Sequence, residues 1–198
     1  MEAMWSRYQP QTTVIRRLLA DGALGEVRNV FADLSHAAPT DPGHRLRRPD
    51  LGGGALLDLG IYPVQFSSMV LGRPESIVAD GVHVDSGVDA ESTAVLQHAG
   101  VGRSTVHTSM LVRSPSRAHI AGSDARIELD GPFHVPAGFT IAPTEFGAPA
   151  ERWDDPTGIT MFDALSWEAT AAAQYIGEGR DESPLHTLAE TVEILEVQ

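Results

Sequence analysis

Asp58 and Tyr62 are the two side chains in this sequence whose types and spacing most clearly suggest chemistry. They stand four positions apart within LGGGALLDLGIYP, residues 51–63, whose apolar residues recur at helical spacing, so a helix would place both on one face. A tyrosine with an ordinary pKa of about 10 is a protonated donor near neutral pH. It could pass that proton to a carbonyl oxygen while hydride arrives from a cofactor, and a carboxylate one turn earlier could orient the substrate. The residues alone leave a second interpretation open, a helix-start carboxylate favoured by the helix dipole beside an amphipathic surface tyrosine.

Three successive glycines, Gly52 to Gly54, precede this pair at the expected start of the helix. They remove side chains where free backbone N–H groups and the positive end of the helix dipole point outward, so a ligand or another chain could approach closely. We therefore interpret Gly53 and Gly54 as candidate cofactor contacts. The run is not a dinucleotide-binding fingerprint, because no strand-turn-helix unit with an acidic residue ending a second strand accompanies it.

The stretch GGGALLDLGIYP resembles the substrate-domain signature of the glucose-fructose oxidoreductase/inositol dehydrogenase (GFO/IDH/MocA) family. It is similar to the branch of dihydrodiol and xylose dehydrogenases, because other branches carry His where this chain has Tyr62. In that branch the matching aspartate and tyrosine are functional, so the resemblance implies functional roles for Asp58 and Tyr62. Two further stretches agree, so the resemblance covers nearly the whole chain: residues 1–8, MEAMWSRY, and residues 182–185, ESPL, followed by Leu188, Glu190 and Thr191.

The resemblance implies an NAD(P)-dependent oxidoreductase that acts on a sugar, polyol or diol by hydride transfer. Proteins similar to this chain begin with a nucleotide-binding Rossmann domain, which carries a glycine-rich phosphate loop and a Glu-Lys-Pro motif with the catalytic lysine. Neither element occurs in this sequence, and every basic residue is Arg, so the chain itself supplies no lysine. We therefore expect residues 1–198 to be a single substrate-binding and oligomerisation domain without its nucleotide-binding domain. NAD or NADP should bind only when that domain is present.

Four further residues are candidates for substrate contact. Arg45, and beside it His44, come from a Pro/Gly-rich loop that leads to the glycine-rich helix, and Arg7 lies near the N-terminus. A guanidinium suits bidentate contact with carboxylate or phosphate and can also bind sugar hydroxyls. The alternative for these basic residues is a solvated loop. Trp5 resembles a similarly placed tryptophan of the family and could wall the nicotinamide and substrate pocket, although an aromatic residue in an apolar run is more often part of the core.

Composition limits the class of protein. The chain has 198 residues, of which 42% are hydrophobic and 21% charged, which is ordinary for one soluble globular domain. A formal net charge of -13 argues against nucleic acid and anionic membranes as partners, because both bind basic patches. No window approaches the unbroken apolar length of a membrane span and the N-terminus shows no signal region, so we expect a cytoplasmic protein. The absence of cysteine excludes a disulfide framework and thiolate metal ligands.

We expect neither a metal site nor a hydrolase centre. Four histidines, His83, His98, His107 and His119, fall on separate predicted strands without the short spacing that metal ligands show. A Ser/His/Asp hydrolase of the common type would need a G-x-S-x-G elbow, which does not occur.

Hydrophobic periodicity predicts helices and short strands that alternate in blocks. The opening apolar run through Trp5 and Tyr8 suggests an extended segment, followed by a helix, a strand over 27–36 and a loop over 37–50 that leads to the central helix. Short connections between the later strands force antiparallel neighbours, so we expect a meander. Two helices, over 162–176 and 185–195, close the chain. The predicted strands of the middle part lie over 76–85, 91–99, 103–112, 116–121 and 126–129, with a further one over 139–142.

These blocks predict an α+β fold, a predominantly antiparallel open sheet with helices packed on one face. Apolar residues such as Val95 and Leu96 fall on both sides of the strand alternation, so neither face of the sheet is purely solvated. A half-apolar open face is typical of a partner surface, and in proteins that resemble this one that face makes the dimer. We therefore expect a homodimer through the sheet. The alternative is that loops or a helix cover this face.

Two functions of different classes stay open on the sequence. The first is the substrate-binding domain of an NAD(P)-dependent oxidoreductase, with a small-molecule sugar or polyol as its partner. The second is a freestanding non-enzymatic domain, either a sugar binder or a dimer-forming remnant of a split or shortened gene. An upstream reading frame that encodes a glycine-rich loop and Glu-Lys-Pro would decide for the first. The choice between NAD and NADP depends on a residue that reads the ribose and would lie in the nucleotide-binding domain.

Overall fold

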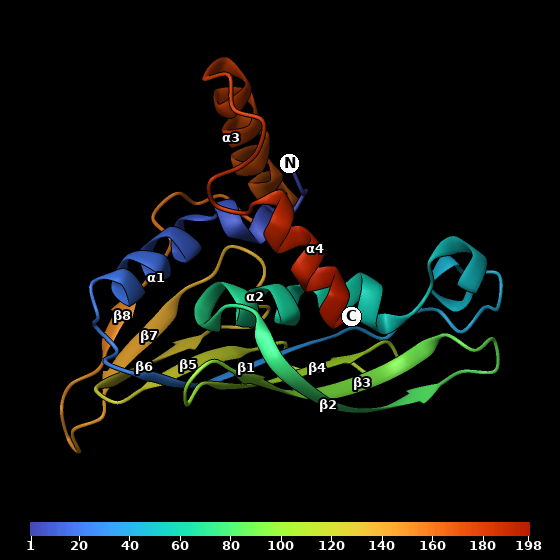
Figure 1. Ribbon diagram of the computed structural model, residues 1–198, viewed down its shortest axis with the longest axis horizontal. Coiled ribbons are helices and arrows are strands. Elements are labelled where there is room, and N and C mark those ends of the chain that lie inside the picture. The colour runs from blue at the N-terminus through green and yellow to red at the C-terminus, as the bar shows by residue number, and fades with distance from the viewer.

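An open sheet of eight strands runs the length of the molecule, and the helices lie on one side of it (Figure 1). This computed structural model describes all residues, Met1–Gln198. The strand order is β2-β3-β4-β1-β5-β6-β7-β8, with β1 and β4 parallel and every other pair antiparallel. The predicted α+β class and one-sided helical layer are confirmed. The strands are β1 (Val27–Ser35), β2 (Pro74–His83), β3 (Asp89–His98), β4 (Arg103–Ser109), β5 (Ala118–Gly122), β6 (Ala125–Leu129), β7 (Phe139–Pro143) and β8 (Glu151–Trp153).

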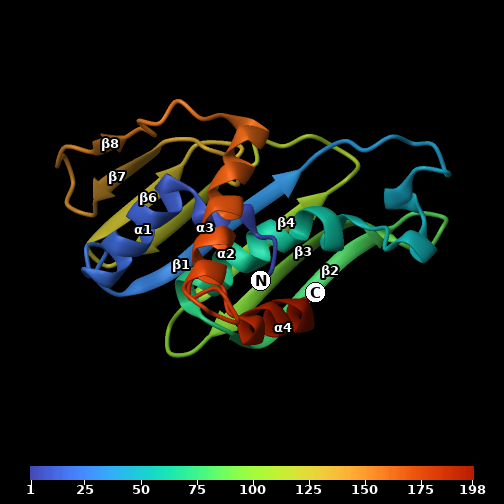
Figure 2. The same ribbon diagram turned by 90° about the horizontal axis from the view of Figure 1, so that it is seen from above.

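The expectation of one continuous meander is wrong at a single joint. β4 and β5 are not neighbours, because β1 lies between them and joins two antiparallel blocks (Figure 2). The chain between β4 and β5 passes the end of β1, where the Ser114 hydroxyl donates to the Asp33 carboxylate. A short connection does not by itself make two strands pair, since an earlier strand can still be inserted between them. The three-residue strand β8 was not predicted, because its Pro/Gly-rich surroundings show no periodicity.

Four α-helices and several short helical turns form the layer above the sheet. The opening segment, expected to be extended, is instead a 3-10 helix, η1 (Trp5–Tyr8). The Arg7 N–H bonds back to the Met4 carbonyl at 2.9 Å, and Pro10 begins the next helix directly afterwards. The helices are α1 (Pro10–Ala20), α2 (Ile61–Leu71), α3 (Leu165–Gly177) and α4 (Leu188–Val197), and the short turns are η2 (Arg45–Arg47), η3 (Pro49–Leu51), η4 (Leu56–Gly60) and η5 (Met161–Ala164).

The central helix α2 lies against β1 and β4, in the middle of the helical layer (Figures 1 and 2). A π-helical turn, η4, leads directly into it. Residues 63–68 are all buried, so the helix is enclosed on nearly every side and not along one stripe, as periodicity predicted. Contrary to expectation, Pro49–Leu71 is long and apolar enough to cross a membrane, by length and composition alone. Half of its 18-residue apolar window is buried within the fold, as in a core helix.

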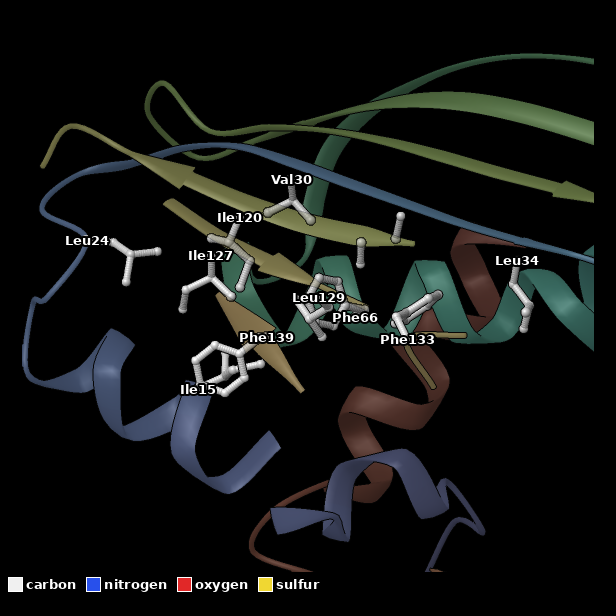
Figure 3. Close-up of a cluster of buried hydrophobic side chains, with 12 residues drawn as sticks. Ile15, Leu24, Val30, Leu34, Phe66, Ile120, Ile127, Leu129, Phe133 and Phe139 are labelled. Atoms are coloured by element: carbon white, nitrogen blue, oxygen red, sulfur yellow. The ribbon is translucent and has the colours of Figure 1, made fainter. Parts of the chain in front are cut away.

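The main hydrophobic core lies between α1, α2 and the strands β1, β5, β6 and β7 (Figure 3). Phe66 of α2 meets Phe133 with ring centroids 5.4 Å apart, and Phe139 stacks on Trp153 at 5.2 Å. Truncating a buried phenylalanine of this kind costs about 3–5 kcal/mol of stability. The core therefore fixes the position of α2, which carries Tyr62 at its start. Its labelled members in Figure 3 are Ile15, Leu24, Val30, Leu34, Phe66, Ile120, Ile127, Leu129, Phe133 and Phe139.

α3 and α4 leave much of their apolar surface exposed. α3 points away from the sheet and has no buried residue (Figure 1). The side chains of Phe162, Leu165 and Ile176, which periodicity places in a core, are 71%, 45% and 76% exposed. α4 buries only Ile194. Periodicity located both helices, but their apolar faces stay uncovered within this chain.

The opposite face of the sheet carries no helix (Figure 1). Val78 of β2 and Val95 of β3 lie opposite each other and are 76% and 45% exposed. Farther along the same face, Phe31 stacks on His119 with ring centroids 5.5 Å apart. No loop or helix of this chain covers these residues, which was the alternative expectation for this face. Apolar side chains therefore face solvent on β2 and β3, in a row that also includes Thr105 of β4 and the Phe31–His119 pair.

Candidate active site

Tyr62 lies where η1 meets the start of α2. The indole of Trp5 donates a hydrogen bond from Nε1 to the Tyr62 hydroxyl oxygen at 2.9 Å. Trp5 is buried, and Tyr62 is partly buried against the main core. Tyr62, which was expected to move a proton, is therefore in direct contact with Trp5, which was expected to line the pocket.

Burial raises the pKa of the Tyr62 hydroxyl, because the protein around it solvates a phenolate poorly. The hydrogen bond from Trp5 lowers the pKa of Tyr62, since it stabilises the phenolate, and the charges of Asp58 and Glu168 raise it. The net effect keeps the phenol protonated at neutral pH. Tyr62 thus keeps its proton at neutral pH, and the Trp5 N–H is placed where it would stabilise a phenolate at this position.

His134, which was not identified from the sequence, has its ring against Tyr62. The two ring centroids are 4.7 Å apart, and the Trp5 ring meets His134 edge-on at 6.0 Å. Two buried glutamines hold the loop in place. Gln9 donates to the His134 carbonyl at 2.8 Å, and Gln11 donates to the carbonyls of residues 133 and 135 at 3.0 Å. The Pro/Gly-rich stretch around His134 has no periodicity, so only the fold reveals this placement.

Burial lowers the pKa of His134 to about 4, so its ring is neutral near pH 7. Its Nδ1 atom is buried and has no hydrogen-bond partner. A neutral imidazole places no positive charge beside the Tyr62 phenol. The three rings of Trp5, Tyr62 and His134 therefore form an aromatic cluster with one acidic proton, that of the phenol.

Asp58 lies in η4 and forms an ion pair with Arg45 of η2. The side chains are 25% and 57% exposed, so the pair stabilises the fold by only about 0–1 kcal/mol. Asp58 is also close enough to Tyr62 for its charge to raise the pKa of that phenol. The structure thus brings Asp58, Arg45 and Tyr62 into one region, as the sequence predicted for the loop and the helix start. Their contact with substrate stays a prediction.

Arg7 is not placed where substrate contact was expected. The guanidinium of Arg7 is 2% exposed and donates to Gln65, Glu190 and a backbone carbonyl. A buried guanidinium must be paired in this way, so Arg7 serves packing and is not available to a substrate. His44 directly precedes η2 and caps it, because its Nδ1 accepts a long hydrogen bond, 3.4 Å, from the Leu46 N–H. Contact of His44 with substrate stays a prediction.

The glycines at the helix start are required by contacts within the chain. A Cβ on Gly53 would lie 2.7 to 2.8 Å from three loop carbonyl oxygens. Gly54 has a φ of +122°, and its Cβ would lie 2.2 Å from a carboxylate oxygen of Asp89. That carboxylate accepts a hydrogen bond from the Leu56 N–H at 2.7 Å. Asp89 thus occupies the helix start that was expected to be open to a cofactor, which removes the basis for assigning Gly53 and Gly54 to cofactor contact.

Comparison with known proteins shows the family to which this chain belongs. A family model described as the GFO/IDH/MocA C-terminal domain matches residues 12–128. The chain belongs to the GFO/IDH/MocA family. Trans-1,2-dihydrobenzene-1,2-diol dehydrogenase of Xenopus tropicalis is 32% identical over 193 residues, which are 96% of this chain and 58% of that protein. The Homo sapiens protein of the same name is 31% identical over 96% of this chain and 57% of its own length.

These relatives confirm the resemblance to the dihydrodiol dehydrogenase branch of the GFO/IDH/MocA family. The chain spans somewhat more than half of their length. A 3-ketoreductase from Actinomadura kijaniata in complex with NADP and TDP-benzene superimposes with a TM-score of 0.78 at 24% identity, over 100% of this chain and 58% of that one. An aldose-aldose oxidoreductase from Caulobacter crescentus complexed with glycerol superimposes with a TM-score of 0.80 at 24% identity. The match covers 98% of this chain and 57% of that one. Likeness at this identity shows that the fold is shared.

Proposed function

We propose that this chain is the substrate-binding domain of an NAD(P)-dependent oxidoreductase that acts on a sugar, polyol or diol, with Tyr62 giving and taking the proton. The hydrogen bond of 2.9 Å from Trp5 to Tyr62 supports this role most directly. The phenol oxygen accepts from the indole, and its own proton is donated to no side chain or backbone acceptor in the chain. That proton is therefore available for transfer. Family membership and relatives named as diol dehydrogenases support the reaction class.

In the reducing direction, a dinucleotide held by the nucleotide-binding domain would supply hydride for the carbonyl carbon of the substrate. Tyr62 gives its O–H proton to the carbonyl oxygen, so the product is an alcohol and Tyr62 is left as a phenolate. The Trp5 Nε1–H, already 2.9 Å from the phenol oxygen, stabilises that phenolate. Oxidation reverses the proton step, because the phenolate takes the proton of the substrate hydroxyl. Asp58 and Arg45 would orient the substrate beside the phenol.

The residues of this chain do not fit the phosphates of a dinucleotide. The one glycine-rich helix start is occupied by the Asp89 carboxylate, which would repel a phosphate. NAD or NADP would therefore be held by a separate nucleotide-binding domain. Within that arrangement this chain supplies the proton, the aromatic wall and the substrate contacts.

We also propose that two copies of the chain associate through the uncovered sheet face. Val78 and Val95 form an exposed apolar pair on β2 and β3. Beyond Thr105 of β4, the row continues with the stacked rings of Phe31 and His119 on β1 and β5. Exposed rows of this kind are more common at contacts between proteins than on monomers. A symmetric dimer would cover the same row on both copies.

The function is tested by joining the nucleotide-binding part of the Xenopus tropicalis relative to residues 1–198. The chimera should reduce NAD or NADP when given a trans-dihydrodiol, an aldose or a polyol, as measured by the absorbance of the reduced nicotinamide. The same nucleotide-binding part alone is the matched control and should show no turnover. A folded chimera that binds the dinucleotide but oxidises none of these three substrate classes would contradict the proposal and favour a non-enzymatic binding domain.

A further inference from the structure

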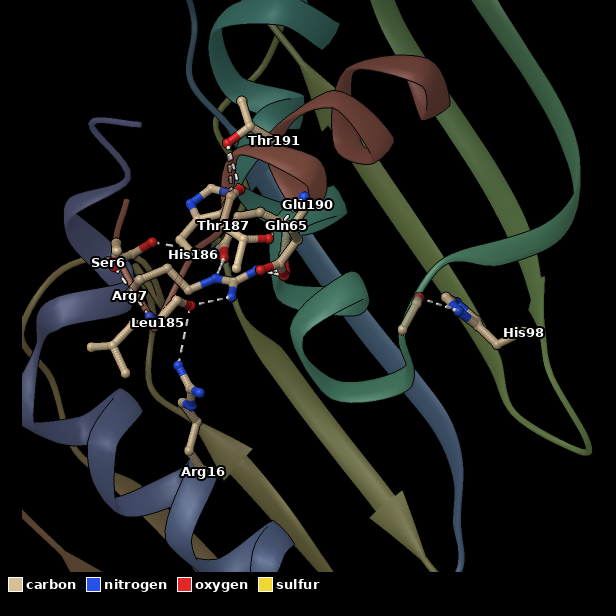
Figure 4. A network of polar contacts seen from close by, with 12 residues as sticks. Ser6, Arg7, Arg16, Gln65, His98, Leu185, His186, Thr187, Glu190 and Thr191 are labelled. Carbon is tan, nitrogen blue, oxygen red and sulfur yellow. Dashed lines mark hydrogen bonds and ion pairs between the residues drawn. The ribbon is translucent and has the colours of Figure 1, made fainter. Parts of the chain in front are cut away.

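Arg7 is a buried positive charge, and each nitrogen of its guanidinium donates a hydrogen bond (Figure 4). Nε donates to the Gln65 side-chain oxygen at 2.5 Å, and Nη2 donates to the Gln65 carbonyl at 3.1 Å and to the Glu190 carboxylate at 2.5 Å. Nη1 donates to the Leu185 carbonyl at 3.1 Å. A guanidinium is planar and rigid, so this set of acceptors fixes its position.

Gln65 receives the arginine on α2, three residues after Tyr62. Its side-chain oxygen accepts from Arg7, and its side-chain nitrogen donates to the Ser6 hydroxyl at 3.1 Å. Both partners belong to η1, the same four-residue turn that carries Trp5. All of these contacts are buried. Gln65 therefore clamps η1 onto α2 right beside the Trp5–Tyr62 pair.

The hydrogen bond from Trp5 to Tyr62 joins the same two elements, but it is only partly buried. One turn of 3-10 helix has little stability of its own, so the position of the indole depends on what holds η1. We propose that Arg7 is a positioning residue that, through Gln65, sets the hydrogen bond between Trp5 and Tyr62. This inference rests on the proposed role of Tyr62 in proton transfer.

Glu190 of α4 supplies the counter-charge for Arg7. Its backbone N–H is held by the Thr187 side chain, which caps α4 at 3.1 Å. A second tie runs from the Tyr8 hydroxyl of η1 to the Ser183 hydroxyl at 2.8 Å. Residues near the C-terminus thus help to hold η1, because Glu190 contacts the guanidinium of Arg7 across 183 positions of sequence.

The test reads the hydrogen bond in the 198-residue chain itself. The Trp5 indole N–H resonance in NMR spectra, assigned with Trp5→Phe, reports the bond, and titration of the Tyr62 phenol, assigned with Tyr62→Phe, reports its effect. The double variant Arg7→Met/Glu190→Leu removes both charges together, because an apolar pair preserves stability better than one charge left unpaired. We expect the indole proton to shift upfield and exchange faster. We also expect the pKa of Tyr62 to rise, since its phenolate loses a donor.

Gln65→Met is a second variant, because it removes the two side-chain hydrogen bonds from Gln65 to η1. The ion pair between Arg7 and Glu190 and the bond from Arg7 to the backbone carbonyl of residue 65 stay in place. This variant should produce the same two changes. Arg16→Met is the matched control. Arg16 donates to the same Leu185 carbonyl at 3.2 Å, but it makes no hydrogen bond to α2. It should leave the indole resonance and the Tyr62 titration as they are.

An unchanged indole resonance and an unchanged Tyr62 titration in either folded variant would overturn the positioning role. Equal changes in Arg16→Met would also overturn it, because they would show a general loosening of the chain. These readouts need neither cofactor nor turnover. If the indole resonance and the Tyr62 titration both change in these variants but the chimera shows no turnover, the positioning role is supported and the proposed reaction is contradicted.

Discussion

The free energy of unfolding should fall between about pH 6.5 and about pH 4, and His134 should carry a distinct share of that loss. Burial lowers the pKa of His134 from 6.5 to about 4, so between these values the unfolded chain binds a proton that the folded chain does not. The contribution is fully present above about pH 6.5 and is lost as the pH falls through this window. Below it, both states carry the proton.

The gap between the two pKa values of His134, about 2.5, corresponds to about 3.4 kcal/mol at 1.36 kcal/mol per pKa unit. Because the ring is only partly buried, we expect about 2 kcal/mol. His134→Phe keeps a ring beside Tyr62 and removes the titrating nitrogens. Urea unfolding at about pH 7 and about pH 4.5, followed by circular dichroism, should show that the wild type loses about 2 kcal/mol more than this variant. His83→Phe, at an exposed position on β2, should lose as much as the wild type.

Burial also lowers the pKa of His98 and of His186. The wild type and His134→Phe therefore both lose stability in acid as these two histidines take up protons. Only the difference between the wild type and His134→Phe isolates His134. Equal losses in the two proteins would refute the inference that His134 is held neutral by burial against Tyr62.

Gly54→Ala should lower the free energy of unfolding by about 1–3 kcal/mol in urea titrations, because its Cβ meets Asp89 at a φ of +122°. Gly52→Ala, with open space around its Cβ at a φ of +65°, should cost about 1 kcal/mol, and equal costs would contradict the role given to Asp89. The chain should sediment as a dimer at tens of micromolar, and Val95→Arg should give a monomer; a monomeric wild type would contradict the sheet interface. Calorimetric titration of the chain with NAD or NADP should detect no binding, and micromolar affinity would contradict the absence of a phosphate site.

Most of the secondary structure follows from local pattern, because alternation marks strands and Gly or Pro marks their ends. The predicted strands over 76–85, 91–99 and 103–112 correspond to β2, β3 and β4 within a few residues. The parallel pairing of β1 with β4 could not be predicted, since local pattern carries no information about which distant strands become neighbours. The exposed faces of α3 and α4 were missed for a related reason, because periodicity shows an apolar face but not what covers it.

Asp58, Tyr62 and Arg45 could be proposed from the sequence because they lie in one short stretch, and the structure brings them into one region. Their functional roles stay predictions. Arg7 was misassigned, because the sequence of an arginine does not show whether the fold buries it among acceptors. His134 was missed, because its aperiodic loop is held by glutamines that lie more than a hundred residues earlier in the chain. Tertiary contacts, and not local pattern, decided both cases.

The central claim is that Tyr62 moves the proton, and Tyr62→Phe in the active chimera tests it most directly. The change keeps the ring against Trp5 and His134 and deletes the acidic proton. We expect kcat to fall by about two to four orders of magnitude with KM less affected, and some activity to persist because hydride transfer belongs to the cofactor. Asp58→Asn should reduce kcat less, and its effect should not add to that of Tyr62→Phe. Near-normal kcat in Tyr62→Phe, with activity abolished in Asp58→Asn, would contradict the account and assign the proton to Asp58 or to a residue of the nucleotide-binding domain.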